Sequence, residues 1–329
     1  MTKVLVTGGT GHAGFFSIVK FLEKGYDVNT SVRDLLKTED LFKTIKDYGN
    51  FDDEAMSKLK FFQAVLGEES GWEDALEGVT YVNDVAYPFI NHVPLEQLID
   101  AALNGTMSLA KLAVASPSVE HFCFTSSYAA VAFGDTPKDG LYDGNDWTPE
   151  DSKMLDGYML SKIIVEKKLW EFFKSDENLK SKYPTTFNVI CPYGIYGPVP
   201  TKHYSGSLAP LKSVIDGSKA PILGYTLSVT DVRNLADAYV AACENKDSYW
   251  ERFTLQTDDA ITFDDMTKLA VEKYPALKSQ ASTEKTPFIL GARLADCSKA
   301  KKLLGYKPTP IKETILDSVK SIVVNEKLV

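Results

Sequence analysis

The chain has 329 residues, of which 44% are hydrophobic and 25% are charged, and its formal net charge is −9. Such a chain is long enough to bury a sizeable core, as one large domain or two packed lobes. The acidic balance disfavours a nucleic-acid backbone or an anionic membrane surface as partner, because both attract basic patches, but it leaves room for a local basic site.

The first part of the chain alternates between predicted strands and helices. Residues 4–7 (VLVT) are apolar and β-branched and predict a buried strand. Residues 13–24 repeat large apolar side chains at helical spacing, and Gly25 ends that helix. We expect further strands at 27–32, 59–62, 79–86 and 121–127, charged helical sequence at 35–60, and a helix at about 95–115. This alternation predicts a parallel sheet with helices on both faces.

The middle of the chain has longer connections. A polar loop rich in Gly, Pro and Asp covers 134–152, and a helix is predicted near 155–174. Residues 186–198 predict a sixth strand that runs into a turn. Four prolines then interrupt the stretch 198–222, which is typical of a substrate-binding lobe rather than of a sheet core.

Residues 228–243 predict a return to the main sheet followed by a helix, and residues 250–329 are expected to complete the smaller lobe. We therefore predict an α/β fold, a Rossmann-type doubly wound parallel sheet with a smaller C-terminal substrate lobe. The sheet domain would span 1–195 and take back 228–245, and residues 196–329 would form mainly the lobe.

A glycine-rich turn, "TGGTGHAG", joins the first predicted strand to the first helix. Gly8, Gly11 and Gly14 follow the spacing G-x-x-G-x-x-G, and Gly9 is an additional glycine. A tight turn needs a residue without Cβ, a second glycine admits a pyrophosphate to backbone N–H groups, and a third allows close helix–strand packing. A turn without any ligand is the alternative, but the strand before and the helix after favour a dinucleotide site. His12 is interpreted as a tolerated loop residue, neither a ligand nor a catalyst.

The end of the second strand indicates which dinucleotide binds. Folds of this kind that prefer NAD usually carry an acidic residue here, whereas an arginine accommodates a 2′-phosphate. The chain reads "SVRD", so Arg33 favours NADPH, and Lys37 is a second candidate cation. A surface arginine paired with Asp34 is the alternative.

A tyrosine and a lysine carry the strongest chemical signal. Tyr158 and Lys162 in "GYMLSK" are four residues apart on a predicted helix and share one face. An ammonium group one turn away is expected to lower the pKa of the phenol, which would make the tyrosine a general acid in carbonyl reduction. Ser126 and Ser127 end a strand about thirty residues upstream and supply a hydroxyl for the substrate oxygen. A solvent-facing pair and a strand-end turn are the plainer alternatives.

The motifs "TGGTGHAG", "FTSSYAAV", "YMLSK", "CPYGIYGP", "TDVRNLADAYVAA" and "KKLLGYKPTPIKETILDS" occur in this order and span essentially the whole chain. Together they resemble an extended short-chain dehydrogenase/reductase. Within that superfamily the chain is most similar to the NADPH-dependent reductases of ketones and aldehydes, the methylglyoxal reductase and dihydroflavonol reductase subgroup.

The resemblance implies a role for each matching position. Ser127 would be the catalytic serine, Tyr158 the proton donor, Lys162 a ligand of the nicotinamide ribose, and Asn104 the holder of a water chain to that lysine. The cofactor-binding residues that it implies, together with those argued above, are Gly8, Gly9, Thr10, Gly11, His12, Ala13, Gly14, Arg33, Lys37, Val65, Leu66, Ala86, Tyr87, Thr125, Tyr158, Lys162, Pro192, Ile195 and Ser207.

Three positions depart from the family pattern. Val65 stands where related reductases carry an Asp that meets the adenine amine, so adenine binding there must rest on backbone or packing. The usual "HVASP" is here Asp84 to Pro88, which places a charge in an apolar strand that needs a partner or water. Tyr87, in the same motif, could reshape the substrate pocket or stack near the cofactor. Cys191 replaces a frequent Asn and is interpreted as an inert, half-buried thiol.

The predicted activity is the NADPH-dependent reduction of a ketone or aldehyde to an alcohol. The alternatives are an enzyme like the nucleotide-sugar epimerases and dehydratases, and a non-catalytic dinucleotide sensor. Several aromatic side chains could line an apolar substrate pocket, although core packing is the plainer interpretation of each: Tyr193, Tyr196, Tyr204, Tyr225 and Phe288.

Location and partners follow from simpler features. The four cysteines show no paired spacing, which suits a reducing compartment and gives no zinc signature, so no metal is expected. There is no basic N-terminal region of a signal peptide, and no unbroken apolar run reaches the roughly 18 residues that a bilayer requires. We predict a cytoplasmic monomer or homodimer that binds a small carbonyl substrate, and neither nucleic acid nor membrane.

Overall fold

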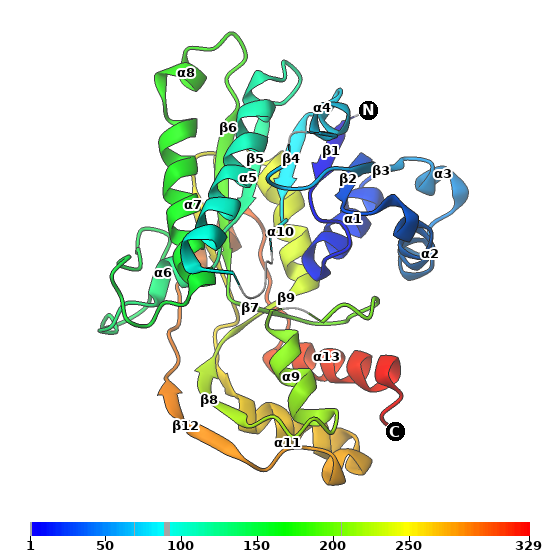
Figure 1. Cartoon of the computed structure of the whole chain (residues 1–329), viewed down its shortest axis with the longest axis vertical. Coiled ribbons are helices and arrows are strands. Elements are labelled where there is room, and N and C mark those ends of the chain that lie inside the picture. The colour runs from blue at the N-terminus through cyan, green and yellow to red at the C-terminus, as the bar shows by residue number, and fades with distance from the viewer. Residues whose placement is uncertain (1, 69, 89–92, 205) are drawn as a thin grey trace.

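The structure is a computed structural model that describes residues 2–68, 70–88, 93–204 and 206–329 (Figure 1). Its main sheet has seven parallel strands in the order β10-β6-β5-β4-β1-β2-β3. These strands are β1 (Lys3–Val6), β2 (Asp27–Val32), β3 (Leu59–Gln63), β4 (Tyr81–Asp84), β5 (His121–Thr125), β6 (Thr186–Pro192) and β10 (Arg252–Leu255). The predicted Rossmann-type α/β fold is confirmed.

The helices that connect these strands cover both faces of the sheet. The chain moves one way from β1 to β2 and the opposite way from β4 to β5, so right-handed crossovers place their helices on opposite faces. On one face α1 (His12–Glu23) packs beside α10 (Val232–Glu244), and on the other α5 (Leu95–Ala115) packs beside α7 (Gly157–Phe173). Shorter elements complete this part: η1 (Leu35–Lys37), α2 (Thr38–Gly49), α3 (Asp53–Met56), α4 (Trp72–Leu76), α6 (Ala129–Ala132), α8 (Asp176–Leu179), η2 (Lys246–Ser248) and α12 (Ser298–Leu303).

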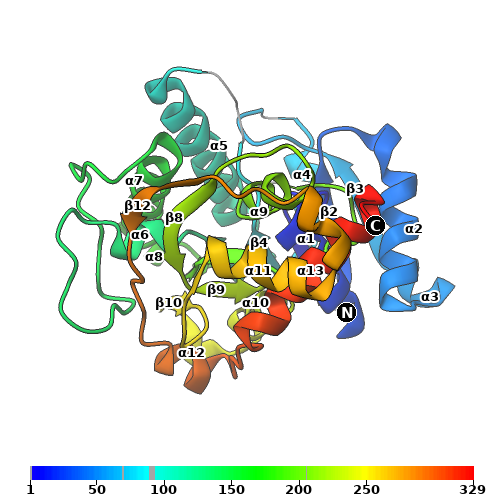
Figure 2. The ribbon, with the colours of Figure 1, turned by 90° about the horizontal axis from the view of Figure 1, so that it is seen from below.

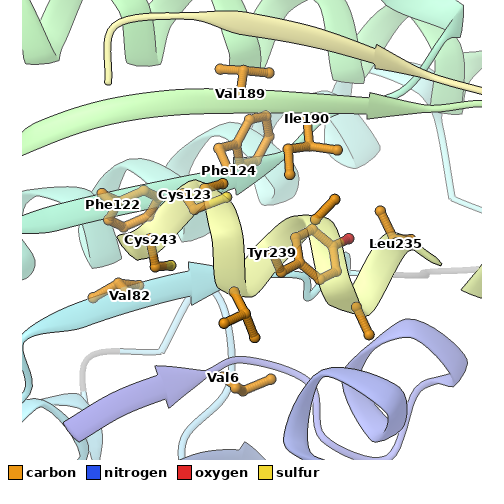
Figure 3. Packing of buried hydrophobic residues seen from close by; sticks show 14 of the residues in the cluster. Val6, Val82, Phe122, Cys123, Phe124, Val189, Ile190, Leu235, Tyr239 and Cys243 are labelled. Atoms are coloured by element: carbon orange, nitrogen blue, oxygen red, sulfur yellow. The ribbon is translucent and has the colours of Figure 1, made fainter. Parts of the chain in front are cut away.

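The core lies between the sheet and these helices. Every residue of β5 is buried, since it is a central strand with helices on both faces. Figure 3 shows Leu235, Tyr239 and Cys243 of α10 pointing toward side chains of the sheet such as Val82 and Cys123. All four cysteines are free thiols and buried.

A second, smaller hydrophobic cluster forms below the sheet in Figure 1. It is built on a three-stranded sheet in the order β11-β8-β12 and on helices that Figure 2 shows from below. Its elements are α9 (Leu208–Ile215), β8 (Ile222–Leu227), β11 (Ile261–Thr262), α11 (Phe263–Lys273), η3 (Pro275–Ser279), β12 (Lys285–Leu290) and α13 (Ile311–Glu326). Between the two parts, β7 (Gly194–Tyr196) pairs with β9 (Val229–Asp231).

Several element predictions for the second half of the chain are wrong. Residues 252–255 were expected in the lobe, but they form the edge strand β10 of the main sheet, whose four residues begin with an arginine that hides the apolar pattern. Residues 228–231 do not return to that sheet, because β9 pairs with β7 instead. Helix α9 also forms within the proline-interrupted stretch, with Pro210 in its first turn, where a missing N–H breaks no helical bond.

The boundary between the sheet domain and the lobe stays a prediction, and the packing of the C-terminal part of the chain bears on where it lies. Besides α10, the segment from Leu290 to Tyr306 contributes buried side chains to the cluster around the main sheet. The sheet side of the molecule therefore takes back more of the chain than 228–245.

Helix α5 is more apolar than the sequence analysis indicates. Within the described residues it is the one helix long and apolar enough, by length and composition alone, to cross a membrane. In this structure it connects β4 to β5 and packs beside α7, with its small side chains Ala102, Gly105 and Ala110 buried. Its buried face, 33% of its most apolar stretch, serves the packing of the sheet domain.

Candidate active site

The glycine loop between β1 and α1 needs its glycines for three separate reasons. Gly8 has φ +68°, in the left-handed region that favours glycine. A Cβ on Gly14 would overlap the carbonyl oxygen of Gly8, and a Cβ on Gly9 would overlap the hydroxyl oxygen of Thr30. At Gly11 the nearest atom to such a Cβ is Gly8 O at 3.3 Å, so the protein itself crowds this position least. The loop is thus tightly packed at Gly9 and Gly14 and least crowded at Gly11.

The first turn of α1 is prepared for an anion. Gly11 is the N-cap and offers no side-chain acceptor, and no acidic residue lies in the first turn. The backbone N–H groups at this end carry partial positive charge, which suits the pyrophosphate of a dinucleotide. Together with the steric requirement for Gly8, Gly9 and Gly14, this means that the residues present fit such a cofactor. Thr10, Gly11 and Ala13 lie at this turn.

His12 is not a tolerated loop residue, and that interpretation is corrected here. It is the first residue of α1, its side chain is buried, and its Nε2 lies 2.7 Å from the carbonyl oxygen of Pro198. Burial lowers the pKa of His12 to about 4, so the ring is neutral at pH 7 and Nε2–H is the donor. His12 therefore connects the phosphate end of α1 to the segment that follows β7.

Arg33 and Lys37 lie beyond the end of β2, and both are exposed. Lys37 Nζ is 3.9 Å from Asp34 Oδ2, whereas Arg33 forms no ion pair with any carboxylate of the described residues. Asp34 also caps η1 by accepting from Leu36 N. Arg33 is thus an uncommitted cation at the position that the 2′-phosphate of NADP would approach in this fold.

Val65 and Leu66 follow β3 and are half-buried. The carbonyl oxygen of Val65 already accepts from Glu68 N at 3.0 Å and from Trp72 Nε1 at 3.3 Å. Because the side chain offers no acceptor and the carbonyl is engaged, an adenine at this position would have to be recognised by packing and by the Val65 N–H.

A network of hydrogen bonds joins the ends of β1 and β4. Thr7 Oγ1 donates to Asp84 Oδ1 at 2.7 Å and accepts from the N–H groups of Val85 and Ala86 at 2.9 and 2.8 Å. This explains why β4 ends at Asp84, two residues before the predicted end. A Cβ on Gly8 would lie 3.2 Å from Ala86, so the glycine loop packs directly on this turn.

The two serines after β5 point to different partners. Ser127 lies within hydrogen-bonding reach of the Tyr158 side chain and acts on the pKa of its phenol. Ser126 is buried and donates to Glu166 Oε2 at 2.5 Å. The structure therefore brings Ser127, the residue chosen from the sequence, to the tyrosine, and turns Ser126 away.

Burial raises the pKa of Tyr158 to about 12, and the hydrogen bond from Ser127 opposes this shift in part. The expected lowering of this pKa by Lys162 is not seen, because burial of the phenol dominates. Lys162 is 4% exposed, and its Nζ donates to Thr125 O at 2.8 Å. Burial lowers the pKa of Lys162 to about 8, and the charges of Asp84 and Glu166 oppose that change.

Tyr87 closes one side of this pair. Its ring meets the ring of Tyr158 edge to face with centroids 5.0 Å apart, and Lys162 Nζ lies 5.0 Å from its centroid. The hydroxyl groups of Tyr87 and Ser161 are 2.7 Å apart. The Ser161 hydroxyl donates its own proton to the backbone carbonyl oxygen of Tyr158, so the Tyr87 hydroxyl is the donor in its contact with Ser161. Tyr87 thus packs beside both candidate catalytic side chains.

Glu166 and Arg252 are residues that the sequence reasoning missed. Glu166 is fully buried, one helical turn after Lys162, and its Oε1 accepts from Arg252 Nε at 2.5 Å. Arg252 also donates to the carbonyl oxygens of Ala130 and Asp146, and its guanidinium lies 3.9 Å from the ring centroid of Trp147. The pair therefore fastens the segment after Ser127 to α7 and β10. The periodicity of α7 could have indicated Glu166 as a charge on its buried face.

The remaining predicted residues lie at three places. Pro192 ends β6, and Ser207 lies against Gly194, the chain neighbour of Ile195. Asn104 is exposed on α5, and its side chain makes no hydrogen bond to Lys162 or to any other described residue. Cys191 is fully buried rather than half-buried, and burial raises the pKa of its thiol to about 12, which makes it inert.

The aromatic residues proposed for a substrate pocket divide into two kinds. Tyr196 is 1% exposed and belongs to the lobe's core, whereas Phe288 on β12 is 73% exposed. Tyr193 lies next to the site, with its ring centroid 4.7 Å from that of Tyr128. Core packing therefore explains Tyr196, and Tyr193 remains a candidate for substrate contact. Among the residues that the structure describes, no three His, Cys, Asp or Glu side chains gather as they would around a metal ion.

The fold and the glycine loop define a dinucleotide-binding enzyme of the Rossmann type, with candidate acid–base residues at the carboxyl edge of its sheet. The model of the NAD dependent epimerase/dehydratase family matches residues 4–253, so the chain belongs to that family.

Individual relatives narrow this class. Cinnamoyl-CoA reductase CAD2 of Medicago truncatula is 28% identical over 97% of this chain and 95% of its own length. Dihydroflavonol 4-reductase of Arabidopsis thaliana is 33% identical over 66% of this chain and 55% of its own. The crystal structure of yeast methylglyoxal/isovaleraldehyde reductase Gre2 complexed with NADPH covers 100% of both chains, with a TM-score of 0.80 and 25% identity. The predicted resemblance and the class of dinucleotide-dependent oxidoreductase are confirmed.

Proposed function

We propose that this chain reduces a ketone or aldehyde group of a small molecule to an alcohol, with NADPH as the hydride donor. The observation that carries the proposal is the placement of Ser127 within hydrogen-bonding reach of Tyr158, in a fold whose glycine loop lies at the carboxyl ends of β1 and β4. In folds of this type the ligand crevice opens at that switch point of the strand order.

The side chains divide the chemistry between them. Ser127 would hold the carbonyl oxygen through its hydroxyl group. Tyr158, with a pKa of about 12, is protonated at neutral pH and so carries the proton that the developing alkoxide needs. Lys162 would bind the ribose and keep a positive charge near that proton. NADPH, when bound along the glycine loop, supplies the hydride, and holding both reactants in place contributes much of the rate.

Two observations support NADPH over NADH. Arg33 is an exposed arginine without an ion-pair partner among the described residues, and its guanidinium matches the geometry of a phosphate. The yeast Gre2 structure was solved with NADPH. The chain is proposed to act in the cytoplasm, as a monomer or homodimer, on a small-molecule substrate.

The test follows cofactor oxidation against a panel of diketones, aldehydes and aryl ketones, with NADPH and NADH in parallel. NADPH should be preferred, and Arg33→Ala should reduce that preference roughly tenfold, the size of one charge-assisted hydrogen bond. Lys37→Ala is the matched control, since Lys37 is already near Asp34, and it should change the preference less.

Two other outcomes would replace the proposal. Purification with tightly bound NAD and conversion of a UDP-sugar would identify an epimerase. Dehydration is disfavoured by Tyr128-Ala129, which follow Ser127 where sugar dehydratases carry an acidic pair. If Tyr158→Phe leaves every measured activity unchanged, the chain is a dinucleotide sensor instead.

A further inference from the structure

Asp84 is a buried carboxylate that the proposed chemistry does not yet use. It is the last residue of β4, it is 0% exposed, and it lies opposite Phe124 in the pairing of β4 with β5. Its Oδ1 accepts from Thr7, and its Oδ2 has no hydrogen-bond partner among the described residues. An unpartnered carboxylate oxygen in the interior costs free energy unless a charge compensates it.

Lys162 is the cation whose charge acts on the Asp84 carboxylate. Its Nζ lies 5.1 Å from the ring centroid of Phe124, the residue paired with Asp84, and its one hydrogen-bond partner among the described residues is the carbonyl oxygen of Thr125. No carboxylate of the described residues forms an ion pair with it. Of the charges that favour its protonated form, Asp84 contributes most, ahead of Glu166.

Glu166 is not available as the counter-charge of Lys162, because both of its carboxylate oxygens already accept hydrogen bonds. They accept from Arg252 and Ser126, and Trp170 Nε1 adds a third donor at 3.2 Å. Asp84 is therefore the negative charge near Lys162 that is not neutralised by another cation.

Thr7 extends the influence of Asp84 to the cofactor loop. The single proton of its hydroxyl group points to Asp84, which leaves the oxygen free to accept from Val85 and Ala86. Gly8 follows Thr7 directly and packs on Ala86. The carboxylate thus orients a hydroxyl group that holds the turn under the glycine loop.

We propose that Asp84 is a positioning residue that keeps Lys162 in its ammonium form and, through Thr7, holds the Val85–Ala86 turn against the glycine loop. The proposal rests on the proposed function for its catalytic part only. The pattern that the chain resembles has a histidine at this position, so the carboxylate is a property of this chain.

The groups around Asp84 define the pH range in which it acts. The titratable groups whose charges interact with that of Asp84 are Lys162 on α7, Cys123 on β5 and Tyr239 on α10, and Thr7, which follows β1, does not titrate in this range. Burial raises the pKa of Asp84 to about 6 and lowers that of Lys162 to about 8. Between these values both groups are charged, and the high pKa values of the thiol and the phenol keep Cys123 and Tyr239 neutral.

The first experiment compares the pH dependence of kcat for the wild type, Asp84→Asn and Thr7→Val. The asparagine keeps an oxygen acceptor for Thr7 but removes the charge. The alkaline limb of the kcat profile should therefore shift to lower pH by about 1 pH unit. Thr7→Val keeps the charge, so its limb should stay in place while its Kd for NADPH rises. An unchanged limb in Asp84→Asn, or the same shift in both variants, overturns the proposal.

A second measurement does not depend on any activity. Lys162→Met leaves Asp84 without a counter-charge, so its Tm should fall at pH 8, and adding Asp84→Asn should recover part of that fall. At pH 5, where Asp84 is protonated, the two substitutions should be additive. Additivity at both pH values overturns the pairing, whereas a failure of the proposed function would show as absent carbonyl reduction with this coupling intact.

Discussion

Helix α7 carries two buried charges one turn apart, and they are treated in opposite ways. Glu166 accepts from Ser126, Trp170 and Arg252, and Arg252 also donates to three backbone carbonyl oxygens. Lys162 has one carbonyl oxygen, two aromatic rings and a carboxylate that forms no ion pair with it.

The difference separates a structural charge from a chemical one. The Arg252 pKa is raised despite its burial, because Glu166 lies against the guanidinium and accepts its hydrogen bonds, so Arg252 stays charged. The pKa of Lys162 falls to about 8, within reach of physiological pH. A buried charge with every partner in place holds the fold, whereas one with few partners remains able to respond to a ligand or a proton.

The largest effect is expected at the chemical end of the helix. Tyr158→Phe should reduce kcat by roughly 10²- to 10⁴-fold, because the proton donor is lost, with little change in the free energy of unfolding. Steady-state kinetics and urea unfolding measure the two quantities. Tyr249→Phe is the matched control, since its hydroxyl donates to Cys243 O and its ring stacks on His121 at the opposite edge of the sheet. Equal kcat losses in both variants would contradict the role of Tyr158.

At the structural end, Arg252→Met should lower the free energy of unfolding by about 3–5 kcal/mol, because Glu166 is left as an uncompensated buried charge. Urea unfolding at pH 7 tests this. The double variant with Glu166→Gln should recover part of the loss, and a loss that the second substitution deepens would argue against the ion pair as its source.

Asp84 is intermediate between the structural charge Glu166 and the chemical charge Lys162, and its contribution to the free energy of unfolding depends on pH. Burial raises its pKa from 3.8 to about 6, so the folded state holds a proton that the unfolded state has already released. This group therefore stabilises the fold at low pH, and its contribution is lost as the pH rises from about 4 to about 6, by at most about 3 kcal/mol. Wild-type stability should fall by that amount relative to Asp84→Asn across this range. Parallel stability curves would contradict the shifted pKa.

The smallest effect is expected at Ser126. Ser126→Ala removes one hydrogen bond to Glu166, which keeps Arg252, so the free energy of unfolding should fall by only about 1–2 kcal/mol and kcat should hardly change. Ser127→Ala should instead reduce kcat strongly at nearly constant stability. A kcat loss in Ser126→Ala as large as that in Ser127→Ala would erase the distinction between the two serines.

Much of the sheet domain follows from local sequence. The boundaries of β2 and α5 agree with the predicted ranges because strand and helix periodicities are unbroken there, and the glycine spacing located the loop. The choice of Ser127 and Tyr158 agrees with the contact that the structure makes between them.

What failed depended on partners distant in sequence. Nothing near Arg252 signals that it begins a strand of the main sheet, since its pairing partner Val189 lies on β6 and its ion-pair partner Glu166 lies 86 residues earlier. His12 gave no local sign of its bond to Pro198, 186 residues away. The role of Asn104 stays a prediction: motif position placed it on α5, whose buried face, with Ala102, Gly105 and Thr106, leaves it exposed. Long-range pairing decides such positions, and periodicity does not report it.

The engaged carbonyl oxygen of Val65 bears on how strictly the enzyme selects its coenzyme. With Glu68 N and Trp72 Nε1 already bonded to that oxygen, no acceptor at this position is left to distinguish an amino group from a carbonyl on the purine. Discrimination would fall instead to Arg33, the cation proposed to meet the ribose phosphate, and to packing around the base. A coenzyme analogue with hypoxanthine in place of adenine should therefore serve nearly as well as the natural one, so the chain would be selective for the ribose phosphate and tolerant of the base.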